Sequence, residues 1–437
     1  MTATITPTDK TEKSDKSTLG VSTPGTEVFE RRESVVRSYC RSWPVVFERA
    51  SGAEQVTEDG RTYLDFFAGA GALNYGHNHP VVKGALMDYL ATDNVIHALD
   101  MFTPAKREFL TTFEETILNP RGLEYKIQLP GPTGTNSVET ALKIARKATG
   151  RSDVVSFTNA FHGMTLGSLA VTGNSMKREG AGAPLYHSTT APYDDYFDGQ
   201  TPDFHWLERV WADSGSGIAL PAAVIVETVQ GEGGLRAARD EWLRDLVALC
   251  RRFDVLVIVD DVQAGCGRTG TFFSFESAGI EPDVVCLSKS LSGMGLPLAV
   301  TLLRPELDLW EPAEHNGTFR GFNPAFVTAT AALKEFWSDD RFQQTVQDRC
   351  EQLTDGLQAI IDEQDGASYR GRGLLAGIAF DDVEKAERIA AAAFERGLLI
   401  ETSGPLGEVV KVMPPLTISK DDLARGIDLL AESVRAA

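Results

Sequence analysis

Between Tyr125 and Arg304, short apolar segments rich in β-branched residues alternate with stretches of helical spacing. The apolar segments are continuous, and a strand of this kind is buried on both faces. The expected strands are residues 154–157, 223–226, 255–259, 284–287 and 298–303, and the expected helices between them include 136–149 and 241–253. The alternation predicts an α/β fold with a mostly parallel sheet that is covered by helices on both sides.

The pattern changes after Pro324. Helical spacing is expected at 325–337, 350–361, 384–396 and from Lys420, with strands near 374–380 and 398–400. These elements predict a second, smaller α+β domain. We therefore expect a disordered N-terminal tail at 1–25, an N-terminal segment of the small domain at 26–75, a large domain at 76–323 and the C-terminal small domain at 324–437.

Composition argues against several classes of partner. The 437 residues carry a formal net charge of −20, so the surface repels nucleic acid and anionic membranes. No apolar run approaches the roughly 20 residues that a membrane helix needs, and residues 1–20 lack the hydrophobic block of a signal peptide. Five cysteines are scattered without metal-ligand spacing. We expect a cytoplasmic protein with neither a metal site nor disulfides.

Two expected strands end on residues that constrain the chemistry. One ends on the carboxylate of Asp260, and another ends before the amine of Lys289, 29 positions later (289 − 260). An aldehyde cofactor with a basic ring nitrogen needs such a pair, because the amine binds the aldehyde carbon and the carboxylate keeps the ring nitrogen protonated. The pair predicts pyridoxal 5′-phosphate. The alternative is a surface lysine, but a lysine at a buried strand end must be paired, neutralised or chemically used.

Other polar residues follow the same strand ends. Glu227 lies where ligands of open α/β sheets bind. In the glycine-rich loop after it, Glu232 is either a ligand-facing group or a solvated one. Asp261 has its side chain on the opposite face of the strand from Asp260, so we interpret it as a structural hydrogen-bonding group. Gln263 reaches the phenolic oxygen of the ring if the chain turns back after Asp261.

Two further segments suit the cofactor. The glycine-rich turn at 131–136 stands directly before a predicted helix, where backbone N–H groups and the hydroxyls of Thr133 and Thr135 suit a phosphate. The alternative is a plain capped helix. At 161–163, an aromatic ring followed by a glycine suits stacking on the pyridine face. The alternative there is a core phenylalanine followed by a surface histidine.

With these residues assembled, the chain resembles the class III pyridoxal-phosphate-dependent aminotransferases of fold type I, over nearly all of its length beyond the tail. The resemblance rests on residues 257–270 with Lys289, together with 63–66, 76–80, 161–163 and 227–234. It implies that Lys289 carries the cofactor and acts as the catalytic base, while Asp260 pairs with the ring nitrogen. The other cofactor-binding residues that it implies are Gly134 and Thr135 at the phosphate, Phe161 on the ring face, Gln263 near the phenolic oxygen, and Glu227. Thr318 resembles a threonine that reaches the phosphate of the neighbouring subunit, which implies at least a homodimer.

Within the class, residues 131–136, 227–230, 288–293 and 318–321 resemble the diaminobutyrate–2-oxoglutarate transaminases of ectoine synthesis. The resemblance implies amino transfer from L-glutamate to L-aspartate 4-semialdehyde, in osmotic defence. Asp261 departs from it, because the class usually has glutamate there.

Lys411 is the more important departure, since ornithine-type relatives carry an arginine there that clamps a substrate carboxylate. A lysine cannot form the bidentate fork. Either Lys411 holds the carboxylate as a point charge, or an arginine such as Arg320 does, or Lys411 is a surface residue.

Three other functions stay open on the sequence. One is another class III ω-aminotransferase, acting on ornithine, acetylornithine or 4-aminobutyrate. A second is an aminomutase, which needs no 2-oxo acid partner. The third is a non-catalytic binding module that retains the fold, such as the sensor domain of a regulator. The presence of both Lys289 and Asp260 argues against the third function.

Overall fold

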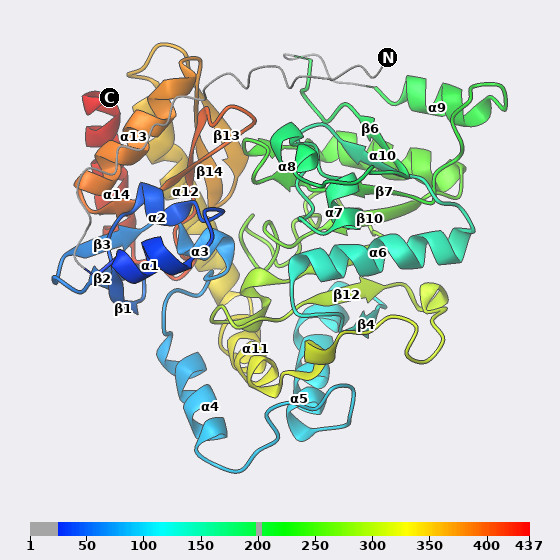
Figure 1. The fold of residues 1–437 in the computed structure, drawn as a ribbon, viewed down its shortest axis with the longest axis horizontal. Helices are drawn as coiled ribbons and strands as arrows, with labels where there is room; N and C mark the ends of the chain where they lie inside the picture. The colour runs from blue at the N-terminus through cyan, green and yellow to red at the C-terminus, as the bar shows by residue number, and fades with distance from the viewer. Residues whose placement is uncertain (1–24, 198–202) are drawn as a thin grey trace, which may run out of the picture.

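The computed structural model describes residues 25–197 and 203–437, so nearly all of the predicted tail at 1–25 lies outside the described residues. A seven-stranded sheet in the order β4-β12-β11-β10-β7-β5-β6 organises the larger part of the chain (Figure 1). Its strands are β4 (Lys126–Gln128), β5 (Val154–Phe157), β6 (Ser188–Ala191), β7 (Ala223–Val226), β10 (Leu256–Asp260), β11 (Val284–Leu287) and β12 (Val300–Leu303). Only β12 runs against the other strands, which confirms the predicted mostly parallel α/β sheet.

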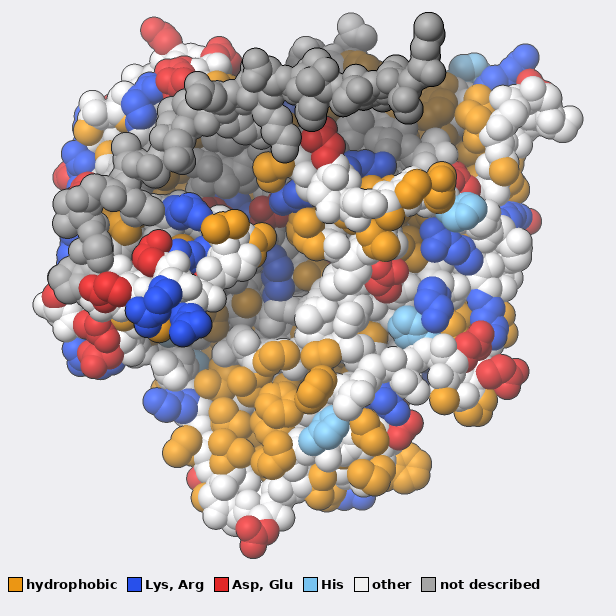
Figure 2. Space-filling view, in the orientation of Figure 1, with side chains coloured by type: hydrophobic (Ala, Val, Ile, Leu, Met, Phe, Trp, Pro, Cys, Tyr) orange, Lys and Arg blue, Asp and Glu red, His pale blue; other side chains and the backbone are white. Residues whose placement is uncertain are grey.

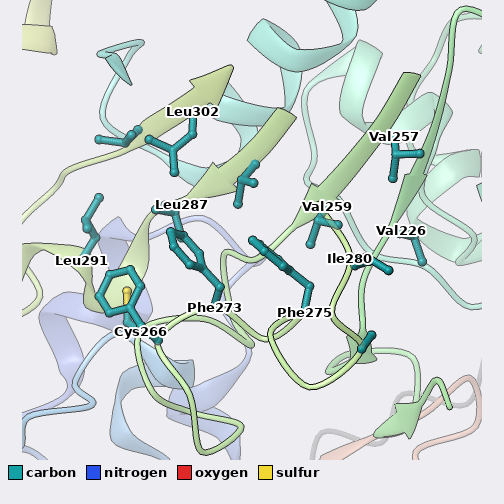
Figure 3. Packing of buried hydrophobic residues seen from close by; sticks show 14 of the residues in the cluster. Val226, Val257, Val259, Cys266, Phe273, Phe275, Ile280, Leu287, Leu291 and Leu302 are labelled. Carbon is teal, nitrogen blue, oxygen red and sulfur yellow. The ribbon is translucent and has the colours of Figure 1, made fainter. Parts of the chain in front are cut away.

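The central strands are buried on both faces, as their continuous apolar sequences predict. In β10, Val257 and Val259 pack into one hydrophobic cluster, while Ile258 between them packs into another on the opposite face. The helix α10 (Asp240–Arg252) contributes its leucines to the first cluster, and α6 (Gly134–Thr149) covers the second. Figure 3 shows the first cluster, in which strand side chains meet rings from the loop after β10, among them Phe273 and Phe275.

The two edge strands escaped sequence prediction. β6 and β4 contain partly exposed and polar positions, because each has a neighbouring strand on one side only. Their sequences therefore lack the continuous apolar run by which a buried parallel strand is recognised.

A second region combines the C-terminal part with the N-terminal segment. Its sheet has the order β13-β14-β17-β16, from β13 (Ala367–Arg372), β14 (Leu375–Phe380), β16 (Glu401–Ser403) and β17 (Val409–Val412). Beside it stand α12 (Arg341–Ile361), α13 (Val383–Glu395) and α14 (Lys420–Ala436), as Figure 1 shows at the left of the molecule. These three helices fall where periodicity predicted them, although α12 begins nine residues earlier (350 − 341).

The N-terminal strands join this second region through one parallel pairing. β1 (Phe47–Ser51), β2 (Glu54–Thr57) and β3 (Thr62–Asp65) form a sheet with β15 (Leu398–Leu399). Leu64 of β3 pairs with Leu398, and both side chains belong to one buried cluster. This pairing brings residues 68–71, which follow β3, to the boundary between the two regions.

The remaining helices and short strands connect these layers. They are α1 (Glu27–Arg32), α2 (Tyr39–Ser42), α3 (Ala68–Gly71), α4 (Pro80–Leu90), α5 (Pro104–Phe113), η1 (Glu114–Leu118), η2 (Asn119–Arg121), α7 (Leu166–Ala170), α8 (Ser175–Glu179), α9 (His205–Ala212), β8 (Val229–Gln230), β9 (Arg236–Ala237), η3 (Lys289–Ser292), η4 (Pro305–Leu307), η5 (Thr318–Gly321) and α11 (Asn323–Phe336). Over the described ranges, we find no helix with the length and apolar character needed to cross a bilayer.

Candidate active site

A cavity of about 190 Å³ lies at the carboxyl ends of β7, β10 and β11. Seven of the eight predicted site residues line it, namely Gly134, Thr135, Phe161, Glu227, Asp260, Gln263 and Lys289. The eighth, Thr318, is exposed in η5 and does not line the cavity. Its neighbour Gly317 lies against the glycine-rich turn, since a Cβ atom built on Gly317 would stand 3.1 Å from Cα of Gly131.

Sheet geometry explains how Asp260 and Lys289 come together. β10 and β11 are neighbouring parallel strands in which Asp260 is level with Cys286. Lys289 follows three residues later and opens the 3₁₀ turn η3, so both side chains project from the same edge of the sheet. Lys289 has φ +49°, which is a left-handed conformation. This conformation costs a residue such as lysine about 1 to 2 kcal/mol, whereas glycine adopts it freely. Such strain is concentrated at functional sites.

The amine of Lys289 is shielded and held by one hydrogen bond. Its Nζ donates to the carbonyl of Ala70 in α3, at 2.8 Å. Burial lowers the pKa of the Lys289 ammonium to about 8, although the negative charge of Glu232 acts to raise it. A substantial fraction of the amine is therefore neutral near physiological pH, which is the form that acts as a nucleophile or base.

Asp260 is paired with a histidine to which sequence reasoning had assigned no role. Nδ1 of His162 lies 2.7 Å from Oδ2 of Asp260, and the backbone N–H of Val262 donates to Oδ1 at 3.2 Å. Burial works to lower the pKa of His162, but the hydrogen bond and charge of Asp260 outweigh it and the pKa is raised. His162 is only 3% exposed, so the alternative of a surface histidine is wrong. The imidazole fixes the orientation of the carboxylate.

Glu227 orients the aromatic residue beside it. Its Oε2 accepts a hydrogen bond from the backbone N–H of Phe161 at 3.0 Å. Burial is the main cause that raises the pKa of Glu227 to about 8, with the charge of Asp260 acting in the same direction and that of His162 against it. Phe161 lines the cavity and remains partly exposed, so part of its ring is accessible to a ligand in the cavity.

The start of α6 is built for an anion. Gly134 and Thr135 are its first residues and line the cavity. Within 25–197 and 203–437, no acceptor takes the N–H group of either residue, and Thr133 before them makes no side-chain cap. A Cβ atom on Gly134 would stand 2.8 Å from the Val262 side chain. Open N–H donors at a helix N-terminus, with no room for a larger side chain, fit a phosphate group.

Lys411 is buried, so the alternative interpretation of Lys411 as a surface residue is wrong. Its Nζ lies 2.9 Å from Glu232 and 3.1 Å from Glu401. The charge of Lys411 lowers the pKa of Glu232 to about 2. Glu232 also accepts a hydrogen bond from Gln263 at 3.3 Å and lines the cavity, so it is not merely a solvated group.

Two other residues of the sequence analysis lie outside the cavity. Arg320 pairs with Asp100 at 2.9 Å. Asp261 is buried and accepts a hydrogen bond from the backbone N–H of Ser274 at 3.0 Å, which agrees with its interpretation as a structural group. Burial raises the pKa of Asp261 to about 7.

Known proteins resemble this chain over nearly its full length. The family model for class III aminotransferases matches residues 37–434. The chain is 62% identical over 420 residues to a diaminobutyrate–2-oxoglutarate transaminase of Streptomyces coelicolor, covering 95% of this chain and 99% of that protein. It is 57% identical over 410 residues to the enzyme of that name from Virgibacillus pantothenticus, covering 93% and 98%.

Solved structures agree on the fold. An ornithine aminotransferase of Toxoplasma gondii, with partial occupancy of pyridoxal phosphate at its active site, has a TM-score of 0.81, 26% identity and 96% coverage of both chains. An acetylornithine aminotransferase of Elizabethkingia anophelis has a TM-score of 0.76 and 24% identity, and covers 94% of this chain and 98% of that chain. By sequence and by fold, this chain belongs to the class III aminotransferases.

Proposed function

We propose that this chain is a pyridoxal-phosphate-dependent diaminobutyrate–2-oxoglutarate transaminase. It transfers the amino group of L-glutamate to L-aspartate 4-semialdehyde and yields L-2,4-diaminobutyrate and 2-oxoglutarate. The observation that carries the chemistry is that Lys289 and Asp260 line the same cavity as the open N–H groups of α6. The substrate assignment is supported by relatives of that activity that are about 60% identical over most of the chain.

Different residues around the cavity hold different parts of the cofactor. Gly134 and Thr135 bind its phosphate, Phe161 lies on the ring face, and Gln263 faces the phenolic oxygen. Asp260, oriented by His162, pairs with the ring nitrogen. Glu227 fixes the backbone beside Phe161. When bound, the cofactor takes up the electron pair released at the substrate carbon.

Lys289 is the group that moves protons. Its amine holds the cofactor between turnovers and, once released, carries a proton to and from the substrate carbon. The lowered pKa of about 8 keeps that amine close to the working pH, where proton transfer is most efficient. One cavity serves both substrates, so 2-oxoglutarate leaves before the semialdehyde enters.

A panel of amino donors and acceptors with purified holoenzyme tests the assignment. We expect L-glutamate and L-2,4-diaminobutyrate to give the highest kcat/KM, followed through the absorption of the cofactor. A preference for ornithine or 4-aminobutyrate as donor rejects the substrate assignment. Repeated turnover without any 2-oxo acid indicates an aminomutase, and cofactor binding without a half-reaction with glutamate indicates a binding module.

We further propose a homodimer in which Thr318 reaches the phosphate of the neighbouring subunit. Hydrophobic side chains gather over the region of α4 and α5 on the face shown in Figure 2. On α4 and in the segment between these helices, Met87, Val95, Met101 and Phe102 are each at least 49% exposed. An apolar area of this kind is typical of a protein interface. Phe319, next to Thr318, is 63% exposed as well.

Replacing Phe102 by Asp is expected to shift the protein from dimer to monomer, because the ring is 99% exposed in the single chain and its burial drives association. Light scattering after size exclusion measures the mass. Tyr186→Asp is the control, since Tyr186 is 68% exposed and lies outside this area. A monomeric wild-type protein, or a dimer that survives the Phe102 change and further Asp substitutions at Met87 and Met101, contradicts this interface.

We also propose the division into a large domain at 76–323 and a small domain formed by 26–75 and 324–437. The pairing of β3 with β15 supports it. A cytoplasmic location is proposed because all five cysteines are free thiols, which suits a reducing compartment. A role in ectoine synthesis under osmotic stress is consistent with diaminobutyrate as the product and with the acidic composition.

A further inference from the structure

A second cavity, of about 170 Å³, adjoins the first. The two share Phe161 and Glu232, which therefore form a common wall. A substrate that extended from the first cavity past Phe161 would enter the second. Polar residues line much of it, including Asn159, Asn174 and Ser175.

Lys177 is the only cationic residue that lines the second cavity within the described part of the chain. It belongs to α8, and its Nζ lies 4.2 Å from the centroid of the Phe161 ring, at the common wall. No carboxylate of the described residues forms an ion pair with it. A cation over an aromatic face keeps its N–H donors open to another partner. Glu232, the acidic residue of the wall, is already neutralised by Lys411 at 2.9 Å.

The inference rests on the proposed function, because it concerns the two substrates. In L-glutamate the transferred amino group is on C2 and the remote carboxylate is C5. In L-2,4-diaminobutyrate the transferred amino group is on C4 and the carboxylate is C1. The same three carbon–carbon bonds separate the reacting carbon from the carboxylate in both molecules, whereas ornithine has one bond more. A single cation at one fixed reach from Lys289 therefore serves both half-reactions.

We propose that the second cavity is the subsite for the remote carboxylate of both substrates and that Lys177 binds it. The polar lining replaces the water that a carboxylate loses on entry, and the ammonium supplies the opposite charge. The subsite selects for chain length, because a longer ω-amino acid places its carboxylate beyond Lys177 when its amine is at the reacting position.

Lys177→Met and Lys177→Arg in the holoenzyme test the proposal. We expect the Met variant to raise KM for L-glutamate and L-2,4-diaminobutyrate by about tenfold to a hundredfold, the effect of losing a hydrogen bond to a charged group. The inhibition constant of glutarate, a dicarboxylate that is not turned over, is expected to rise in parallel. The Arg variant keeps the charge and is expected to stay within about threefold of wild type.

Two controls separate carboxylate recognition from a structural effect. 1,3-Diaminopropane is diaminobutyrate without its carboxylate, so its KM is expected to be the same in the Met variant and in wild type. Lys385, on α13, is another lysine that lies over a ring, with its Nζ 5.1 Å from the centroid of Phe380 in β14, and Lys385→Met is expected to behave as wild type. Its melting temperature and that of Lys177→Met should match wild type.

Unchanged constants for both glutamate and glutarate in Lys177→Met overturn the inference. An equal loss with 1,3-diaminopropane also overturns it, since the effect then does not depend on a carboxylate. Failure of the proposed function looks different, because the wild-type enzyme then prefers another ω-amino donor to diaminobutyrate. The glutarate measurement needs no turnover and still reports on Lys177 in that case.

Discussion

Lys289→Ala is expected to fold as wild type and to lose at least about 10⁴-fold in kcat, because the change removes the amine that we propose as covalent anchor and proton carrier. Among the described residues, the side chain makes one hydrogen bond, from Nζ to the carbonyl of Ala70, so the helix content should not change. Steady-state transamination and far-ultraviolet circular dichroism measure the two effects. The cofactor is expected to dissociate from this variant on dialysis, whereas the wild-type protein retains it.

Lys289→Arg distinguishes the amine from its charge. A guanidinium keeps the positive charge but is never deprotonated in this pH range, so it provides neither a nucleophile nor a base. We expect this variant to be as inactive as Lys289→Ala. Normal steady-state turnover by either variant assigns the proton transfer to another residue and contradicts the proposed role.

Asp260→Asn has the second largest expected effect, a loss of about 10³-fold in the rate of the half-reaction with glutamate. Two charges about 4 Å apart interact by roughly 4 kcal/mol at an effective dielectric near 20, and the loss of that energy from the transition state corresponds to this factor. The amide has the shape of the carboxylate and still reaches His162, so the packing is preserved. Stopped-flow absorption of the cofactor measures the rate.

Asp261→Asn is the matched control, because it removes a carboxyl group one residue further along the chain. Asp261 does not line the cavity and contacts Ser274 on the other side of the strand end. Its half-reaction rate is expected to stay within about tenfold of wild type. Equal rates for the Asp260 and Asp261 variants would mean that Asp260 exerts no special influence on the ring.

Local sequence was sufficient to predict the large sheet and the proximity of Asp260 and Lys289. Continuous apolar segments indicate strands that are buried on both faces, and parallel strands place their carboxyl ends at one edge. Asp260 and Lys289 each follow such a segment, so their proximity follows from the position of each residue in its own element. No knowledge of distant contacts is needed for that step.

Local sequence could not predict the contacts between segments that are distant along the chain. His162 is 98 residues from Asp260 in the chain, and nothing in the string Phe-His-Gly distinguishes a buried histidine from an exposed one. The burial of Lys411 could not be predicted from local sequence either, because a lysine in a short apolar strand can also be exposed. Only the fold brings Glu232 and Glu401 beside it. The second cavity likewise exists only where α8 packs near the loop after β5.

The sequence by itself determined the class of fold, the order of its main elements and the residues at the strand ends, because hydrophobic periodicity and turn residues act over a few neighbouring positions. Only the tertiary structure decided which charges are compensated. The burial of Lys411 between two carboxylates, the pairing of His162 with Asp260 and the open ammonium of Lys177 depend on which remote segments pack together. The energy of a buried charge is set by those neighbours and not by its own place in the chain.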